Sequence, residues 1–144
     1  MTSTILRCSV ATLAFAGALA FASPSMAAMT TFKVNMSGKT EVPPNTTAGS
    51  GTVTATYDSD SKKLTWKGNY SGLTGPATAA HFHGPAAAGK NAGVMIPIAP
   101  ATSPLEGSAT LNDAQAKALM DGDMYVNVHT AANKGGEIRG QLTK

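Results

Sequence analysis

Apolar and polar residues alternate along most of the chain. Residues 51–57 place Val53, Ala55 and Tyr57 on one face and threonines on the other, and residues 64–70 repeat the alternation. The polar turn 58–61 between these two runs predicts a β-hairpin. Similar runs, separated by Gly, Pro, Asn and Asp, occupy residues 32–36, 78–83, 94–98, 105–111, 126–128 and 138–142. The pattern predicts about eight short strands in an all-β sandwich or barrel.

Two local signals refine this prediction. Pro97 cannot donate a hydrogen bond to a neighbouring strand, so it indicates an edge strand. Asn112 and Gln115 have the spacing of a capping box, and helix-forming residues follow until Gly122. We therefore expect one short helix near residues 113–121. The longest connection, residues 84–93, is rich in Gly, Ala and Pro and is expected to be flexible.

The first 27 residues have the composition of a secretory signal peptide. Arg7 precedes an apolar run over residues 8–21, and small residues including Ser25 and Ala27 follow it. The run is shorter than the roughly 20 residues that a membrane-spanning helix needs. We predict a signal peptide over residues 1–27, cleaved after Ala27 or one residue later, and a single domain over residues 28–144. The mature chain is then periplasmic or secreted, and is not inserted in a membrane.

Composition limits what this domain can build. The chain has 144 residues, which suits one domain, and its single cysteine, Cys8, leaves with the signal peptide. Disulfide frameworks and multi-cysteine metal clusters are therefore excluded. The formal net charge is +3, and loss of Arg7 lowers it to +2. The remaining lysines are scattered, so no clustered basic face indicates a nucleic-acid partner.

The three histidines are the only clustered chemistry in the sequence. His81 and His83 project from one face of a predicted strand, and His129 ends another strand. All three lie opposite in parity to the core residues, so neighbouring strands would bring them together beneath the loop 84–93. Three neutral imidazoles suit one copper or zinc ion, and Met95 is a candidate fourth ligand. In the alternative, His81 and His129 bond to loop carbonyls and serve only to hold the loop.

Other polar groups form no catalytic arrangement that the sequence reveals. The chain lacks a nucleophile elbow, an H-E-x-x-H motif and a phosphate-binding glycine loop. Most carboxylates fall in turns or at outward strand positions. Glu137 and Arg139 are expected to face outward on the last strand, where they would pair with neighbours or surround the histidines. We therefore predict a protein that is not an enzyme, while redox chemistry at an open copper position stays an alternative.

Four blocks of sequence carry a family resemblance, and they cover nearly the whole mature chain. Residues 36–44, 80–85, 125–130 and 136–142 resemble, in order and spacing, the signature blocks of the CHRD (chordin) domain. That family includes the repeated domains of chordin, an extracellular antagonist of growth factors, and many exported single-domain bacterial proteins. The resemblance implies an immunoglobulin-like or Greek-key β-sandwich.

A fainter likeness is to the copper-zinc superoxide dismutases, which also carry an H-x-H pair on a strand of their sandwich. Those enzymes bind two metal ions through an aspartate and more than three histidines. The present sequence has only three histidines. At most one mononuclear site remains. The leading hypothesis is an exported domain that binds one copper or zinc ion for sequestration or delivery. The alternative is an interaction module without metal that binds an envelope or extracellular protein.

Overall fold

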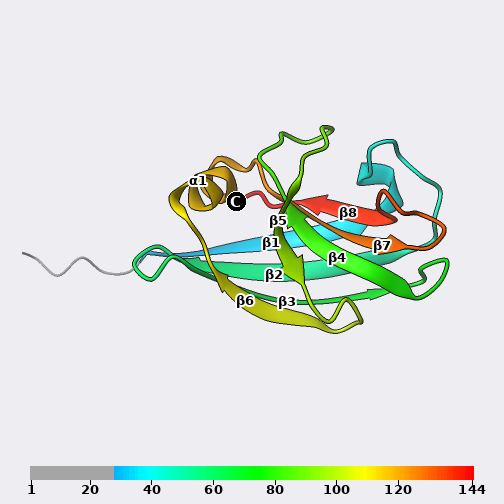
Figure 1. Cartoon of the computed structure of the whole chain (residues 1–144), viewed down its shortest axis with the longest axis horizontal. Helices are drawn as coiled ribbons and strands as arrows, with labels where there is room; N and C mark the ends of the chain where they lie inside the picture. The colour runs from blue at the N-terminus through cyan, green and yellow to red at the C-terminus, as the bar shows by residue number, and fades with distance from the viewer. Residues whose placement is uncertain (1–27) are drawn as a thin grey trace, which may run out of the picture.

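The computed structural model describes residues 28–144, and the predicted signal peptide, residues 1–27, lies outside this part. The described part contains eight strands, one α-helix and a short 3-10 turn (Figure 1). The strands are β1 (Met29–Ser37), β2 (Ser50–Asp58), β3 (Lys63–Ser71), β4 (Ala77–His83), β5 (Val94–Ile98), β6 (Leu105–Thr110), β7 (Tyr125–Thr130) and β8 (Ile138–Gln141). The helix α1 spans Asp113–Asp121, and the 3-10 turn η1 spans Gly38–Thr40. The predicted all-β fold with about eight strands and one short helix is confirmed.

All strand pairs are antiparallel and belong to one sheet, in the order β5-β4-β7-β8-β1-β2-β3-β6. The two end strands, β5 and β6, contact each other, so the sheet nearly closes on itself. After β6 the chain passes through α1 and returns beside β4, which is a Greek-key connection. Pro97 lies on β5, an end strand of the sheet as predicted.

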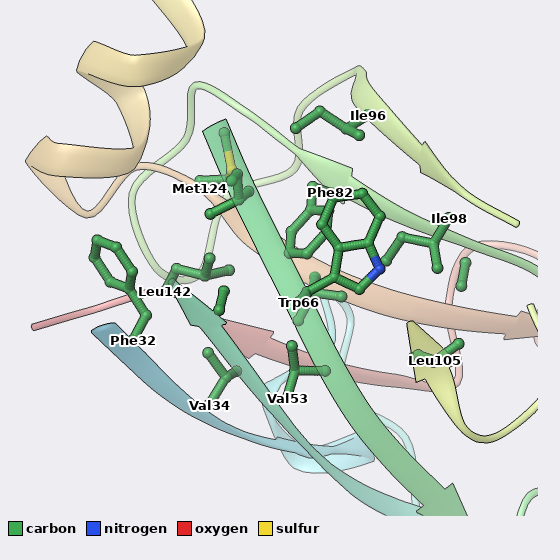
Figure 2. Close-up of a cluster of buried hydrophobic side chains, with 14 of the residues drawn as sticks. Phe32, Val34, Val53, Trp66, Phe82, Ile96, Ile98, Leu105, Met124 and Leu142 are labelled. Carbon is green, nitrogen blue, oxygen red and sulfur yellow. The ribbon is translucent and has the colours of Figure 1, made fainter. Parts of the chain in front are cut away.

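The sheet encloses a single hydrophobic core. Trp66 of β3 meets Phe82 of β4 edge to face, with ring centroids 5.1 Å apart, so residues from opposite halves of the sheet touch across the interior. Figure 2 shows this pair together with buried aliphatic side chains from most of the strands. The residues that the alternation assigned to the core, Val53, Ala55 and Tyr57, are all buried. Burial of such side chains supplies the main stabilising free energy of a domain without disulfides.

The helix has the caps that its sequence predicts. The Asn112 side chain accepts from the Gln115 backbone N–H, and the Gln115 side chain accepts from the Asn112 backbone N–H. Gly122 ends the helix with φ +82°, a left-handed conformation that favours glycine. No helix among residues 28–144 has the length and hydropathy that crossing a bilayer requires.

The outer face of β4, β7 and β8 is covered, unlike the outer face of β2 and β3. Every residue of β7 is buried, including those that point away from the core. The cover is the loop 84–93 together with the segment that follows β1. This covered outer face carries the three histidines.

Candidate metal centre

The pairing of β4 with β7 brings the three histidines together. His81 and His83 occupy alternate positions on β4, and the register places Ala79 opposite His129 and His81 opposite Asn127. Each histidine offers a ring nitrogen that lies within 4.8 Å of the nitrogens offered by the other two. The predicted neighbouring of the two strands and the shared face are therefore confirmed. Within the described residues, this is the cluster of ligand-type side chains suited to a metal ion.

His129 is oriented by a backbone carbonyl. Its Nδ1 donates a hydrogen bond of 2.9 Å to the carbonyl oxygen of Lys134, because that oxygen can only accept. In the neutral ring, Nε2 then carries the free lone pair, and it lies 3.1 Å from Nδ1 of His81. The carbonyl thus fixes both the tautomer of His129 and the direction of its available nitrogen.

His83 has the same arrangement in a more buried place. Its Nδ1 donates to the carbonyl oxygen of Ala92 over 3.0 Å, and its ring stacks on Tyr125 with centroids 4.9 Å apart and planes 2° from parallel. Its Nε2 is buried and has no hydrogen-bond partner among residues 28–144. A buried nitrogen acceptor without a partner is unfavourable, and a metal ion bound to it would offset that cost.

His81 is the least constrained of the three. It is only half-buried, and its ring contacts His129 rather than a backbone carbonyl. Burial, and then the nearby His129 and His83, lower the pKa of His81. Burial also lowers the pKa of His129, although its bond to Lys134 offsets part of this effect. Both rings are therefore neutral at pH 7, and neutral imidazole is the form that binds metals.

The spacing fits one ion after a small movement. Ligand nitrogens at 2.0–2.1 Å from a tetrahedral zinc ion lie about 3.3 Å apart, and the His81–His129 pair, at 3.1 Å, is close to this separation. The nitrogens of the three histidines lie up to 4.8 Å apart, which is more than this separation. Because His81 lacks a backbone tether, rotation of its ring is the movement that would close the set. The chemistry of the three donors and the partnerless Nε2 of His83 both fit a copper or zinc ion.

Two of the histidines make the carbonyl bonds that the structural alternative requires. His129 bonds to the loop after β7, and His83 rather than His81 bonds to the loop 84–93. These bonds use only Nδ1, so the carbonyls leave both Nε2 atoms unused; Nε2 of His83 has no other partner among residues 28–144, and Nε2 of His129 contacts only Nδ1 of His81. Histidine ligands commonly donate their second nitrogen to a carbonyl in this way.

A layer of side chains that the histidine pattern did not predict lies behind His83. The Arg139 guanidinium lies 3.4 Å from the centre of the Tyr125 ring, and His83 stacks on the same tyrosine. Arg139 donates to the Lys90 carbonyl over 2.7 Å and to the Asn91 side chain over 3.1 Å. Arg139 points away from the core as expected, but the loop 84–93 covers it and leaves it 2% exposed. The sequence contains one signal for this position: Arg139, like the histidines, lies on the strand face opposite to the core residues.

Glu137 also differs from its expectation. It points away from the core as predicted, but its carboxylate is fully buried and accepts bonds from the Thr47, Thr74 and Thr130 hydroxyls and the Thr74 backbone N–H. Burial alone would raise the pKa of Glu137, but the hydrogen bonds from these threonines outweigh burial and lower the pKa to about 2. Glu137 is therefore a structural anion that joins two loops to the end of β7, without a cationic partner among residues 28–144.

Glu41 and Asn127 complete the buried polar layer. Burial raises the pKa of Glu41 to about 7, although Arg139 and hydrogen bonds from Val42 and Asn127 partly oppose this effect. Oδ1 of Asn127 is buried without a partner, and Asn127 lies on β7 between Tyr125 and His129. Gly136, with φ +133°, allows this packing, because a Cβ there would stand 2.3 Å from Oε1 of Glu41.

Met95, the candidate fourth ligand, is half-buried and packs against the hydrophobic core. Its sulfur also lies beside Gly84, 3.0 Å from the point where a Cβ on that residue would stand. Its role as a ligand stays a prediction.

A groove of about 390 Å³ opens the histidine cluster to solvent. Its lining includes His81, His129, Thr130 and Lys134.

Comparison with known proteins gives one match. The model of the CHRD domain family matches residues 32–142, which is most of the chain. No curated protein and no solved structure matches the chain.

Proposed function

Because the chain belongs to the CHRD domain family, whose domains are typically extracellular, we propose that it is an exported module that binds one copper or zinc ion. His81, His83 and His129 are the proposed ligands, and the role is sequestration or delivery of the ion. The observation that carries this function is the buried Nε2 of His83, which has no hydrogen-bond partner in the part of the chain that the structure describes.

Three features support nitrogen ligation of a single ion. Carbonyls hold the rings of His83 and His129 through Nδ1, so Nε2 of each ring points into the histidine cluster, where Nε2 of His129 meets Nδ1 of His81. Burial keeps His81 and His129 neutral. Copper and zinc both accept imidazole ligands. Since the protein has only three histidines, the site has room for one ion of this kind and leaves coordination positions for solvent or a partner.

The test is titration of residues 28–144 with copper(II), followed by electron paramagnetic resonance, and with zinc, followed by thermal unfolding. We expect nitrogen hyperfine splitting with copper. Zinc at 100 times its dissociation constant should add about 2.7 kcal/mol to the free energy of unfolding. Replacing His81, His83 and His129 together with alanine should remove both effects.

The Lys134→Ala variant is the matched control. It removes a side chain beside the cluster but keeps the backbone carbonyl that orients His129. It should bind copper as the unchanged protein does. A copper spectrum that is identical in the triple histidine variant would disprove the assignment. In that case the histidines only hold the loops in place, and the alternative function, an interaction module without metal, is favoured.

A further inference from the structure

A second cavity lies over β8, between the segment after β1 and the loop 84–93. Its volume is about 420 Å³, within the range of 300–1,000 Å³ that is common for small-molecule sites. Val42, Pro44 and Ala88 give its wall an apolar part, and Lys39, Glu41 and Arg139 give it a charged part. This combination of an apolar wall and a few convergent polar groups is typical of ligand sites.

The walls of this cavity are held in place by the fold. The Asn91 side chain donates to the Val42 carbonyl over 2.9 Å, which ties one loop to the other. Arg139 donates to the Lys90 carbonyl over 2.7 Å, which ties the loop 84–93 to the sheet. The cavity is therefore formed before any ligand enters, so binding needs little ordering of the chain.

Arg139 lacks a negatively charged partner. Its hydrogen bonds go to the Lys90 carbonyl and to the side-chain amide oxygens of Asn91 and Gln141, all of them neutral, and no salt bridge among residues 28–144 includes it. A buried guanidinium without a counter-ion is costly. A ligand anion beside it would offset that cost.

Glu41 does not supply the missing charge in full. It is the only acid in the wall of the cavity, and burial raises its pKa to about 7, so it is partly protonated at neutral pH. Lys39, on the rim, adds a second positive charge. The cavity thus has an excess of positive charge, and a protonated Glu41 can donate a hydrogen bond to an anion.

We propose that this cavity binds a small organic monocarboxylate with a short apolar tail. The carboxylate lies toward Arg139 and Lys39, and the tail lies against Val42, Pro44 and Ala88. A monocarboxylate suits the site better than inorganic phosphate, because the wall is partly apolar and phosphate would bring further negative charge beside Glu41. The inference does not depend on the metal site, since none of the three histidines lines this cavity.

The experiment is a nuclear magnetic resonance titration of metal-free, isotope-labelled protein, residues 28–144. Hexanoate is the probe, and hexanamide, butyrate and inorganic phosphate are the comparisons. We expect hexanoate to shift the amide signals of Gly89 and of the Gln141 side chain, which lie in the wall. Each methylene buried against the apolar wall should tighten binding about fourfold, so butyrate should bind about 15-fold more weakly than hexanoate.

Variants separate charge recognition from general adsorption. Lys39→Met should weaken hexanoate binding about two- to fivefold, and the exposed Lys63→Met, which is outside the cavity, should not change it. Ala88→Leu reduces the space and should abolish the shifts, while Glu41→Gln should leave binding equal or tighter. These positions avoid Arg139, whose replacement could unfold the protein.

Several results would overturn the proposal. Hexanamide should bind more weakly than hexanoate, and equal affinity would show that the charge plays no part. Loss of hexanoate binding in Glu41→Gln would contradict the charge argument, because removing negative charge from the wall should not weaken the binding of an anion. Shifts that persist in Ala88→Leu would place the ligand elsewhere, and stronger shifts with phosphate would indicate an inorganic-anion site. Failure of copper or zinc to bind would leave each of these results unchanged, so the two proposals are tested separately.

Discussion

Tyr125 shows how a single residue outside the proposed ligand set can control the site. Its ring stacks on His83, and its hydroxyl accepts from the backbone N–H of Ala92 over 3.1 Å. The carbonyl of Ala92 in turn accepts the bond from Nδ1 of His83. The hydroxyl therefore holds Ala92, the residue whose carbonyl orients the histidine.

Tyr125→Phe tests this role. The variant keeps the stacked ring but frees the loop at Ala92, so we expect the affinity for copper to fall about tenfold. The loss of one hydroxyl should lower the free energy of unfolding by about 1 kcal/mol. Isothermal titration and urea unfolding measure the two quantities.

Tyr70→Phe is the matched control for this variant. The Tyr70 hydroxyl donates to the Ala101 carbonyl over 2.8 Å, and its strand β3 pairs with neither β4 nor β7, the strands that carry the histidines. It should show a similar loss of stability with unchanged copper affinity. Equal affinity losses in both variants would mean that Tyr125 has no special link to His83.

The sequence allowed part of this site to be predicted. Alternation assigned His81, His83 and His129 to one face, because parity on a strand depends only on spacing. Parity does not say whether a loop covers that face. The burial of Arg139 and the stacking of Tyr125 depend on the loop 84–93 and could not be deduced from their own strands.

Among the elements, strands and loops differed in how well the sequence predicted them. The strands follow from alternation and α1 follows from its caps, since both signals are local. The loop 84–93 was expected to be flexible, but side chains of β7 and β8 tether it at several points. Val94 has the same strand parity as the buried Ile96, yet it is 54% exposed, because the β4–β5 register shifts at His83. Both differences arise from contacts between segments distant in sequence.

Glu137 connects several of these elements and offers a test at this scale. Its carboxylate accepts from the segment before β2, from the loop before β4 and from the end of β7. Glu137→Gln replaces one acceptor oxygen with a donor that faces hydroxyl and amide groups. We expect the free energy of unfolding to fall by about 3 kcal/mol, measured by urea unfolding at pH 7.

Glu106→Gln controls for the loss of a carboxylate. Glu106 lies on β6 and forms an exposed pair with Lys67 at 3.2 Å. Such pairs contribute about 0–1 kcal/mol, so this variant should unfold nearly as the unchanged protein does. Similar losses in the two variants would contradict a structural role specific to Glu137.

For the molecule as a whole, the buried titrating groups give opposite pH dependences. The folded protein holds Glu41 with a pKa of about 7, above its ordinary 4.5. Its contribution to stability is therefore complete below about pH 4.5 and is lost as the pH rises through 7. His81 and His129 have lowered pKa values, so their contribution is present above about 6.5 and is lost as the pH falls.

Glu41→Gln isolates one side of this balance. We compare the free energy of unfolding of the variant with that of the unchanged metal-free protein. The difference in favour of the variant should grow by about 2 kcal/mol from pH 5 to pH 8. This value is smaller than the full pKa shift would give, because the adjoining cavity admits water. Urea unfolding at the two pH values gives the difference. Parallel behaviour of the two proteins would show that Glu41 titrates in the fold as it does in the unfolded chain.

The position of β8 between β7 and β1 has a consequence for the nascent chain. Hairpins of β1, β2 and β3 can form while later residues are still being synthesised, because their partners are adjacent in sequence. The Lys134 carbonyl that orients His129, and Arg139 behind the loop, come from the last part of the chain to emerge. If the three histidines bind an ion as proposed, their geometry is therefore complete only after the end of the chain has been synthesised and β8 has joined the sheet.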